Sequence, residues 1–298
     1  MAITLLFLTF ALLLVIGLPV AYALISASLV TLLYLGLPEV VAVLQVTAGA
    51  GSSSLLAIPL FIFAGEIMLR GGISERLIGL ASAMVGHIRG GLGQVSVVSS
   101  LFFGGVSGSA IGGAMIPQMT KRGFDRDFSV NVCITAALVA LLVPPSHNLI
   151  LFSAAAGGGL SIADLFAAGM LPALLMTVVL MATGWLIARR RNYATERFPG
   201  VSVLAVRLVS ALPGLLLVAM IFIGIRAGIF TAVESAAVAV VYALLVTLLI
   251  YRDLSLRDFI AACTGAAATT GAIVFVIAAS AVFGWLLAYL EVPAAAVN

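Results

Sequence analysis

The sequence predicts an all-α polytopic membrane protein. Of its 298 residues, 63% are hydrophobic and only 8% are charged, whereas a soluble globular domain carries about a quarter charged residues. The mean hydropathy is +1.30, and the apolar runs are far longer than the roughly ten residues of a barrel strand. Basic residues gather in the loops between these runs, and such clusters mark the cytoplasmic side of a membrane protein.

The chain begins with two apolar runs, residues 3–16 and 19–35, joined by Gly17 and Leu18. They could form one kinked helix or two tightly connected crossings, and we expect two crossings. No basic segment precedes the first run and no cleavage site follows it, so we do not expect a removable signal peptide. A less apolar segment, residues 38–54, comes next.

The following run, residues 55–69, contains Pro59, and we expect a kink there. Glu66 and Arg70 near its end have the i, i+4 spacing that favours an ion pair on a helix. Residues 73–88 alternate charged and apolar positions with a helical period. This pattern is typical of an interfacial helix along the cytoplasmic surface.

Residues 90–119 are apolar and rich in glycine, and we expect them to enter the membrane and return. Basic residues flank them on both sides, which places both flanks in the cytoplasm; these are Arg70, Arg76, Arg89, Lys121, Arg122 and Arg126. As helices, residues 91–106 and 110–120 would span roughly 24 and 17 Å. Each arm is short or marginal for a hydrocarbon core of about 30 Å. The sequence therefore predicts a re-entrant hairpin over about 90–120.

The expected tip of this hairpin is Ser107-Gly108-Ser109. Non-helical backbone within a membrane is tolerated where it is buried in protein or lines an aqueous cavity, so the tip is a candidate ion or solute site. Hydroxyl and carbonyl oxygens suit a hard cation without the cost of burying a full negative charge. The structural alternative is close helix packing by small residues.

A long helix over about 128–156 is expected to break at Pro144-Pro145-Ser146. Two prolines remove two amide donors and free the carbonyls one turn earlier. Polar His147 and Asn148 follow, and polar groups at mid-membrane favour a functional site over a purely structural kink. His147 alone is equally well explained as a hydrogen-bonded structural histidine.

The remaining crossings are residues 165–187, 206–225, 230–251 and 260–290. The polar segment 192–200 divides the chain into a first part, residues 1–200, and a second part, residues 201–298. Residues 61–72 and 281–292 align around Gly65 and Gly284 in opposite orientations, which predicts an inverted-topology repeat. The second copy is incomplete, because its own hairpin is missing. Glu234, close to Arg226, favours a structural role.

The chemistry-bearing residues give little support to an enzyme. Cys133 and Cys263 lie in apolar segments without metal-ligand spacing and are expected to be core residues. The sequence has no Gly-x-Ser-x-Gly elbow, no His-Glu-x-x-His motif and no paired membrane aspartates. An intramembrane enzyme is therefore the weakest alternative.

Several motifs, in order along the whole chain, resemble the large membrane subunit of TRAP (tripartite ATP-independent periplasmic) transporters. They are LLAIPLFIFAGEIM (55–68), GGISERL (71–77), SLFFGGVSGSA (100–110), MIPQMTKRGFD (115–125) and LVPPSHN (142–148). The resemblance implies an elevator-type, multi-pass carrier in the bacterial inner membrane that imports organic acid anions such as C4-dicarboxylates or sialic acid by sodium symport. It implies a periplasmic solute-binding protein and a small membrane subunit as partners, and nothing points to nucleic acid.

The resemblance also implies one sodium site at the first hairpin tip and the broken helix. The matching positions are Ser107, Gly108, Ser109, Pro144, Pro145, Ser146 and Asn148, with the ion near Ser107, Ser109 and Ser146. Sodium would be the coupling ion, and no other cofactor is expected.

Two departures from the family pattern define the alternatives. Only five residues, 111–115, separate Ala110 from Ile116-Pro117, fewer than is common in the family, so we expect a short returning arm. The chain also stops where a second hairpin is expected, as in a C-terminally truncated member. A non-transporting scaffold or a truncated remnant of such a carrier is therefore the alternative function.

Overall fold

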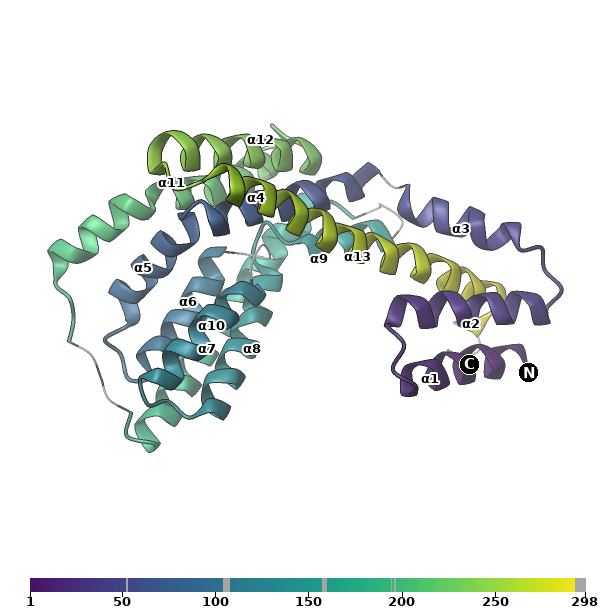
Figure 1. The fold of residues 1–298 in the computed structure, drawn as a ribbon, viewed down its shortest axis with the longest axis horizontal. Coiled ribbons are helices and arrows are strands. Elements are labelled where there is room, and N and C mark those ends of the chain that lie inside the picture. Colours follow the sequence, from purple (N-terminus) through teal and green to yellow (C-terminus); the bar gives the residue numbers. More distant parts are fainter. Residues whose placement is uncertain (52, 104–107, 157–159, 194, 196, 293–298) are drawn as a thin grey trace. The chain divides into compact units, whose positions relative to one another are not determined.

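The computed structural model describes residues 1–51, 53–103, 108–156, 160–193, 195 and 197–292 (Figure 1). Within these ranges the chain forms helices and their connections and no strand. The helices are α1 (Ala2–Val15), α2 (Val20–Tyr34), α3 (Val40–Ala50), η1 (Ser53–Leu56), α4 (Ala57–Arg70), α5 (Ile73–Val85), α6 (Gly91–Phe103), α7 (Gly108–Lys121), α8 (Arg126–Leu142), α9 (His147–Ala155), α10 (Ile162–Arg190), α11 (Val201–Arg226), α12 (Ala232–Leu245), η3 (Val246–Tyr251) and α13 (Leu256–Tyr289).

The helix lengths confirm a polytopic membrane protein. Among the described residues, four helices are long and apolar enough to cross a bilayer: α10, α11, α12 with its π-helical extension η3, and α13. Two further pairs, α4 with α5 and α8 with α9, are bent by 69° and 55° and bring the number to six if each pair is one span. The first two apolar runs form two separate helices, α1 and α2, of 14 and 15 residues.

The chain divides into two compact units, of which the first contains Met1–Leu55 and Ala268–Asn298. Its core joins α1, α2 and α3 to the later part of α13 through Leu6, Leu32, Ala42, Val282 and Leu286. The backbones of α3 and α13 approach closely, because a Cβ added to Gly49 would lie 2.5 Å from that of Ala281.

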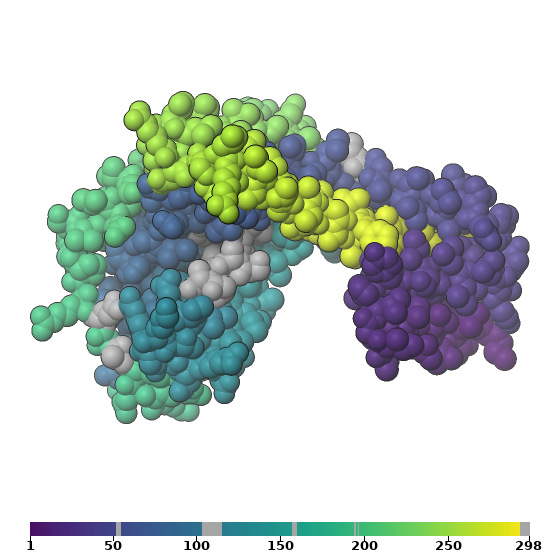
Figure 2. Space-filling view, in the orientation of Figure 1, coloured from purple at the N-terminus to yellow at the C-terminus, as the bar shows by residue number. Residues whose placement is uncertain are grey.

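The second unit contains Leu56–Ala267. Helices α6, α7, α8 and α10 run alongside one another, and α5 lies between α6 and α11 (Figure 1). Helix α12 packs against α4, and Figure 2 shows its light green surface beside the blue of that segment. The boundaries of these units differ from the predicted division near residue 200. Compact units do not test an inverted repeat, because a repeat is defined by internal symmetry. The repeat therefore stays a prediction.

The expected kink at Pro59 is wrong. Pro59 is the third residue of α4, where its missing amide hydrogen would have no intrahelical partner anyway. The bend occurs instead after Arg70, at Gly71 and Gly72, where Gly72 has a φ of +79°. Because a Cβ on Gly71 would lie 2.2 Å from the Thr247 side chain, this bend needs glycine for close packing as well as for its dihedral angle.

Arg76 connects this bend to the turn that precedes α13. Its Nη1 donates to the Gly72 carbonyl oxygen at 2.9 Å and to Asp253 Oδ2 at 2.8 Å. The guanidinium carbon lies 3.7 Å from the centroid of the Tyr251 ring, and the Tyr251 hydroxyl donates to the Ser210 carbonyl oxygen of α11 at 2.7 Å. One half-buried arginine therefore joins α5 to η3 and the start of α13.

Two expectations about acidic residues can be compared with the observed ion pairs. Glu66 and Arg70 form the expected pair at 3.2 Å. Glu234 has the expected structural role, but not beside Arg226: with Thr231 it forms a capping box at the start of α12. Arg226 pairs with Asp164 at 3.0 Å instead.

Candidate functional site

Helices α6 and α7 form the arms of a hairpin. They have 13 and 14 residues, roughly 20 and 21 Å of helix, and they pack against each other and against α8. The start of α6 at Gly91 and Leu92 and the segment after α7 at Arg122–Asp125 line the same cavity of about 510 Å³. The chain therefore returns to the end at which α6 began, as a helical hairpin does, and its re-entry into a membrane stays a prediction.

The returning arm, α7, starts two residues earlier and ends one residue later than the expected arm of 110–120. Helix α7 begins at Gly108, so Gly108 and Ser109 are its first two residues rather than part of a turn. Ser107 lies outside the described residues. Pro117 is accommodated inside the helix, and the arm of roughly 21 Å is still shorter than a hydrocarbon core of about 30 Å.

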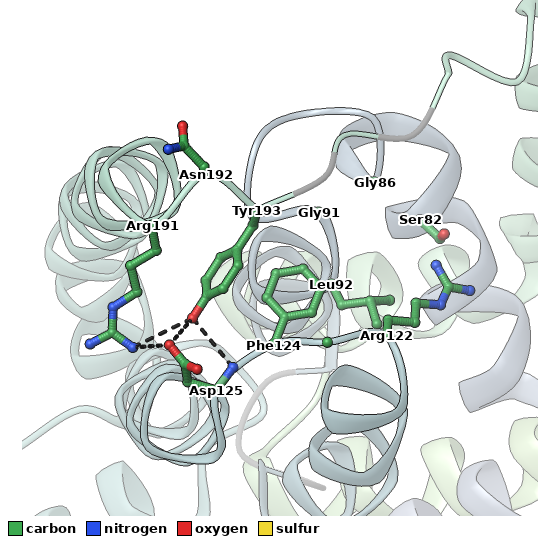
Figure 3. Close-up of a pocket in the computed structure, with 11 residues that line it drawn as sticks. Ser82, Gly86, Gly91, Leu92, Arg122, Phe124, Asp125, Arg191, Asn192 and Tyr193 are labelled. Atoms are coloured by element: carbon green, nitrogen blue, oxygen red, sulfur yellow. Dashed lines mark hydrogen bonds and ion pairs between the residues drawn. The ribbon is translucent and has the colours of Figure 1, made fainter.

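The base of the hairpin is fastened to the end of α10 by the cluster of Asp125, Arg191 and Tyr193 (Figure 3), hereafter the base latch. The Tyr193 hydroxyl donates to Asp125 Oδ2 at 2.7 Å, and Arg191 Nη1 donates to the same oxygen at 2.5 Å. Tyr193 also packs against Phe124 and Phe128. The hydroxyl of Tyr193 and the guanidinium of Arg191 lower the pKa of the Asp125 carboxyl below its ordinary value.

The base latch is expected to open when Asp125 cannot carry a charge. Asp125→Asn should expose the segments around Arg122 and Arg191 and speed their cleavage by trypsin. The matched control is Asp164→Asn, which removes another exposed ion pair and should leave this cleavage unchanged. Equal cleavage rates in Asp125→Asn and the parent protein would contradict the latch.

Acid should have the same effect on the parent protein. A carboxyl with a lowered pKa contributes stability while it is ionised, and that contribution is lost as the pH falls through the lowered pKa, below about 4. Pepsin cleavage at Phe124 and Tyr193 should therefore accelerate in that range in the parent protein. The cleavage rate of the parent protein should be divided by that of Asp125→Asn at each pH. If this ratio does not change with pH, the Asp125 carboxylate does not hold the segment.

The long helix after the hairpin is broken where the prolines predict. Helix α8 ends at Leu142, α9 begins at His147 and the two are bent by 55°. Val143, Pro144, Pro145 and Ser146 are all buried. Ser146 caps α9: its hydroxyl accepts from the Leu149 amide at 3.4 Å and donates to the Leu141 carbonyl oxygen. Ser146 thus supplies a donor to one of the carbonyls that the prolines leave without an amide partner.

Helix α10 packs closely against this break at Gly169. A Cβ added to Gly169 would lie 2.5 Å from the Leu142 carbonyl oxygen and 3.2 Å from Leu149 Cδ1. Gly169 therefore contacts the last residue of α8 and the first turn of α9 at once. The break is a packed feature of the fold and not a loose connection.

The C-terminal end of α6 lies beside the break between α8 and α9. Leu101 and Phe102 share an apolar cavity of about 280 Å³ with Val143 and Pro144. Leu101 also packs against the small core of Val139, Val143 and Ala173. Asn148 lies in the first turn of α9 and is half-buried. Of the predicted site, Pro144 thus lies beside the last described turn of α6, and the side chain of Ser109 is outside the described part.

The sequence of residues 7–297 matches the family described as tripartite ATP-independent periplasmic transporter, DctM component. The chain belongs to this family. It is 35% identical over 285 residues to the 2,3-diketo-L-gulonate TRAP transporter large permease protein of Escherichia coli, covering 93% of this chain and 67% of that protein. These findings confirm the family inferred from the motifs.

Relatives with other named substrates are similar to a comparable degree. The C4-dicarboxylate TRAP transporter large permease protein of Rhodobacter capsulatus is 33% identical, over 85% of this chain and 61% of its own length. The sialic acid TRAP transporter large permease protein of Vibrio cholerae is 33% identical, over 93% of this chain and 66% of its own length. The chain thus spans about two thirds of the length of these relatives, which are transporter components and not enzymes.

Sequence reasoning missed a row of polar groups on α6. Ser96, Ser99 and Ser100 have the i, i+3, i+4 spacing of one helix face, and all three are buried. The Ser96 hydroxyl donates to the Leu92 carbonyl oxygen and lies 3.7 Å from Cys133 Sγ of α8. The hydroxyls of Ser99 and Ser100 have no partner among the described residues. The i, i+3, i+4 spacing of the serines in SVVSS (96–100) is the signal in the sequence that indicates this polar face.

Proposed function

We propose that the chain is the large membrane subunit of a sodium-coupled TRAP transporter that imports an organic acid anion. A periplasmic solute-binding protein would deliver the anion, and a small membrane subunit would support the assembly in the bacterial inner membrane. One observation supports the proposal. In a chain of this family, the last described turn of α6, the first arm of the hairpin, lies beside a buried proline break.

The broken helix offers the ligands that a sodium ion requires. Sodium is a hard cation, and neutral oxygens can hold it within a membrane without an uncompensated carboxylate. The break supplies backbone carbonyls that have lost their amide partners and the buried Ser146 hydroxyl, whose oxygen keeps capacity to accept. Gly108, Ser109 and Asn148 would complete the site together with Ser107, Pro144 and Pro145. Anion binding would use the positive ends of the half-helices.

Sodium dependence tests this assignment. In proteoliposomes with the partner proteins, Ser146→Ala should raise the sodium concentration needed for half-maximal uptake, and Ser107→Ala should do the same. The matched control is Ser28→Ala, because Ser28 is equally buried, at 0% exposed, and its hydroxyl bonds within its own helix. If the sodium concentration for half-maximal uptake is the same in all three variants, the proposed sodium site is contradicted.

The relatives are named for different organic acids, so the substrate of this chain has to be measured. Uptake of C4-dicarboxylates, sialic acid and sugar-derived acids should be compared at one sodium gradient. Uptake of none of them, with or without partner proteins, would favour the non-transporting alternative.

A further inference from the structure

A second cavity, of about 200 Å³, lies at the C-terminal end of α5, next to the cavity at the hairpin base. Its walls come from the C-terminal part of α5 at Gly79 and Ser82, from Gly86 and His87 just after this helix, and from the start of α11 with the segment before it. Ser82 and Gly86 also line the 510 Å³ cavity at the hairpin base. The two cavities therefore share the end of α5 as a common wall.

The described residues that line this second cavity carry only basic charged groups. Arg197 and Arg207 line it, and no carboxylate is among its described lining residues. Neither guanidinium forms an ion pair or a hydrogen bond within the described part of the chain, although arginines elsewhere in the unit, such as Arg76 and Arg191, do. Arg207 reaches across to α5, where its Nη1 lies 3.3 Å from the position of a Cβ on Gly79.

A third nitrogen group faces the same space. The His87 ring packs edge-on against Phe198, with 5.1 Å between ring centroids. Its Nδ1 is buried and has no hydrogen-bond partner among the described residues. A buried polar nitrogen without a partner costs free energy.

Next to the cavity, α11 presents exposed apolar residues. Val203 lines the cavity and is 43% exposed, and Val206, next to Arg207, is 66% exposed. Val209, Leu212 and Leu216 are exposed on the face of α11 that is turned away from Arg207, because a helix turns about 100° per residue. A phosphate group held by the arginines would therefore leave any attached acyl chains next to an apolar surface, whereas a free anion would make no use of it.

We propose that this cavity binds the phosphate headgroup of an anionic phospholipid, with its acyl chains along α11. Basic clusters place this end of the unit at the cytoplasmic leaflet, where anionic lipids are found, and basic pockets between membrane helices bind such headgroups. Guanidinium groups match phosphate oxygens with two parallel hydrogen bonds. The occupant differs from the transported solute, and the proposal does not depend on transport.

Native mass spectrometry of the purified chain in uncharged detergent tests the proposal. Phosphatidylglycerol should bind in preference to phosphatidylcholine with the same acyl chains, with about a fivefold contribution from each arginine. The double variant Arg197→Gln, Arg207→Gln should lose this preference. Arg257→Gln is the control, because Arg257 is also exposed and has no carboxylate partner among the described residues. An unchanged preference in the double variant, or an equal loss in the control, would overturn the assignment.

A second measurement uses the unmodified protein and so does not depend on how the variants fold. In nanodiscs, phosphatidylglycerol should slow amide hydrogen exchange at residues 82–87 and 197–207 relative to phosphatidylcholine. Inorganic phosphate and glycerol phosphate added to phosphatidylcholine nanodiscs should not. Equal protection by these soluble anions would identify a free phosphate compound as the ligand, and no protection by any of them would leave the cavity without an anion site.

Discussion

Gly169→Ala should destabilise the protein by about 1–3 kcal/mol, the usual cost of inserting atoms into a packed interior. The added Cβ would lie 2.5 Å from the Leu142 carbonyl oxygen. This oxygen belongs to the backbone at the end of α8, so it cannot rotate away as a side chain would. The variant must therefore push α10 away from the proline break, and uptake should fall together with the unfolding temperature.

The control for this variant is Gly271→Ala in α13. A Cβ there meets nothing within 4 Å, and alanine is favoured over glycine in a helix by about 1 kcal/mol. Thermal unfolding in detergent should therefore show Gly271→Ala at or above the parent temperature and Gly169→Ala clearly below it. If Gly169→Ala unfolds at the parent temperature, α10 does not hold the break as described.

Arg76→Ala is expected to cost about 2 kcal/mol, because it removes a charged hydrogen bond, a backbone hydrogen bond and a cation–π contact together. Arg76 is 25% exposed on its side chain, so solvent screening reduces but does not cancel these contributions. The loss should appear as a lower unfolding temperature and as faster hydrogen exchange at Gly71–Ile73 and around Asp253. Arg257→Ala, at an exposed arginine of the same unit, should change neither.

A double-mutant cycle separates the ion pair from the rest of this contact. The coupling between Arg76→Ala and Asp253→Asn should exceed about 0.5 kcal/mol, the usual limit for independent sites. The remaining loss in Arg76→Ala then belongs to Tyr251 and the Gly72 carbonyl oxygen. Additive effects of the two substitutions would mean that the 2.8 Å contact is not energetically important.

Local chemistry made several features predictable from the sequence. Long apolar runs between basic loops gave the membrane helices, and the prolines at 144 and 145 gave the break, because proline cannot donate in the helix interior. Basic residues on both sides of 90–119 gave the hairpin. The same kind of reasoning failed at Pro59, because a proline bends a helix only if the helix has already begun, and α4 begins just two residues earlier.

Features that depend on distant residues could not be predicted. Arg76 and Asp253 are 177 positions apart, and Asp125 and Arg191 are 66 positions apart, so no local spacing connects them. Arg226 likewise pairs with Asp164 and not with Glu234, which is closer in the sequence. Glu234 already belongs to the capping box of α12. The two cavities that share α5 follow from the packing of α5 between α6 and α11, which a single sequence does not specify.

The two ends of the helical hairpin respond to different surroundings. At the base latch, Arg191 and Asp125 are 45% and 57% exposed, and mobile ions weaken contacts between exposed charges over a Debye length of about 8–10 Å. The buried hydroxyls near the other end are shielded from such ions by the surrounding helices. A rise in salt concentration should consequently weaken the base latch before it affects the buried end, so ionic strength would change how freely the two arms separate at their base.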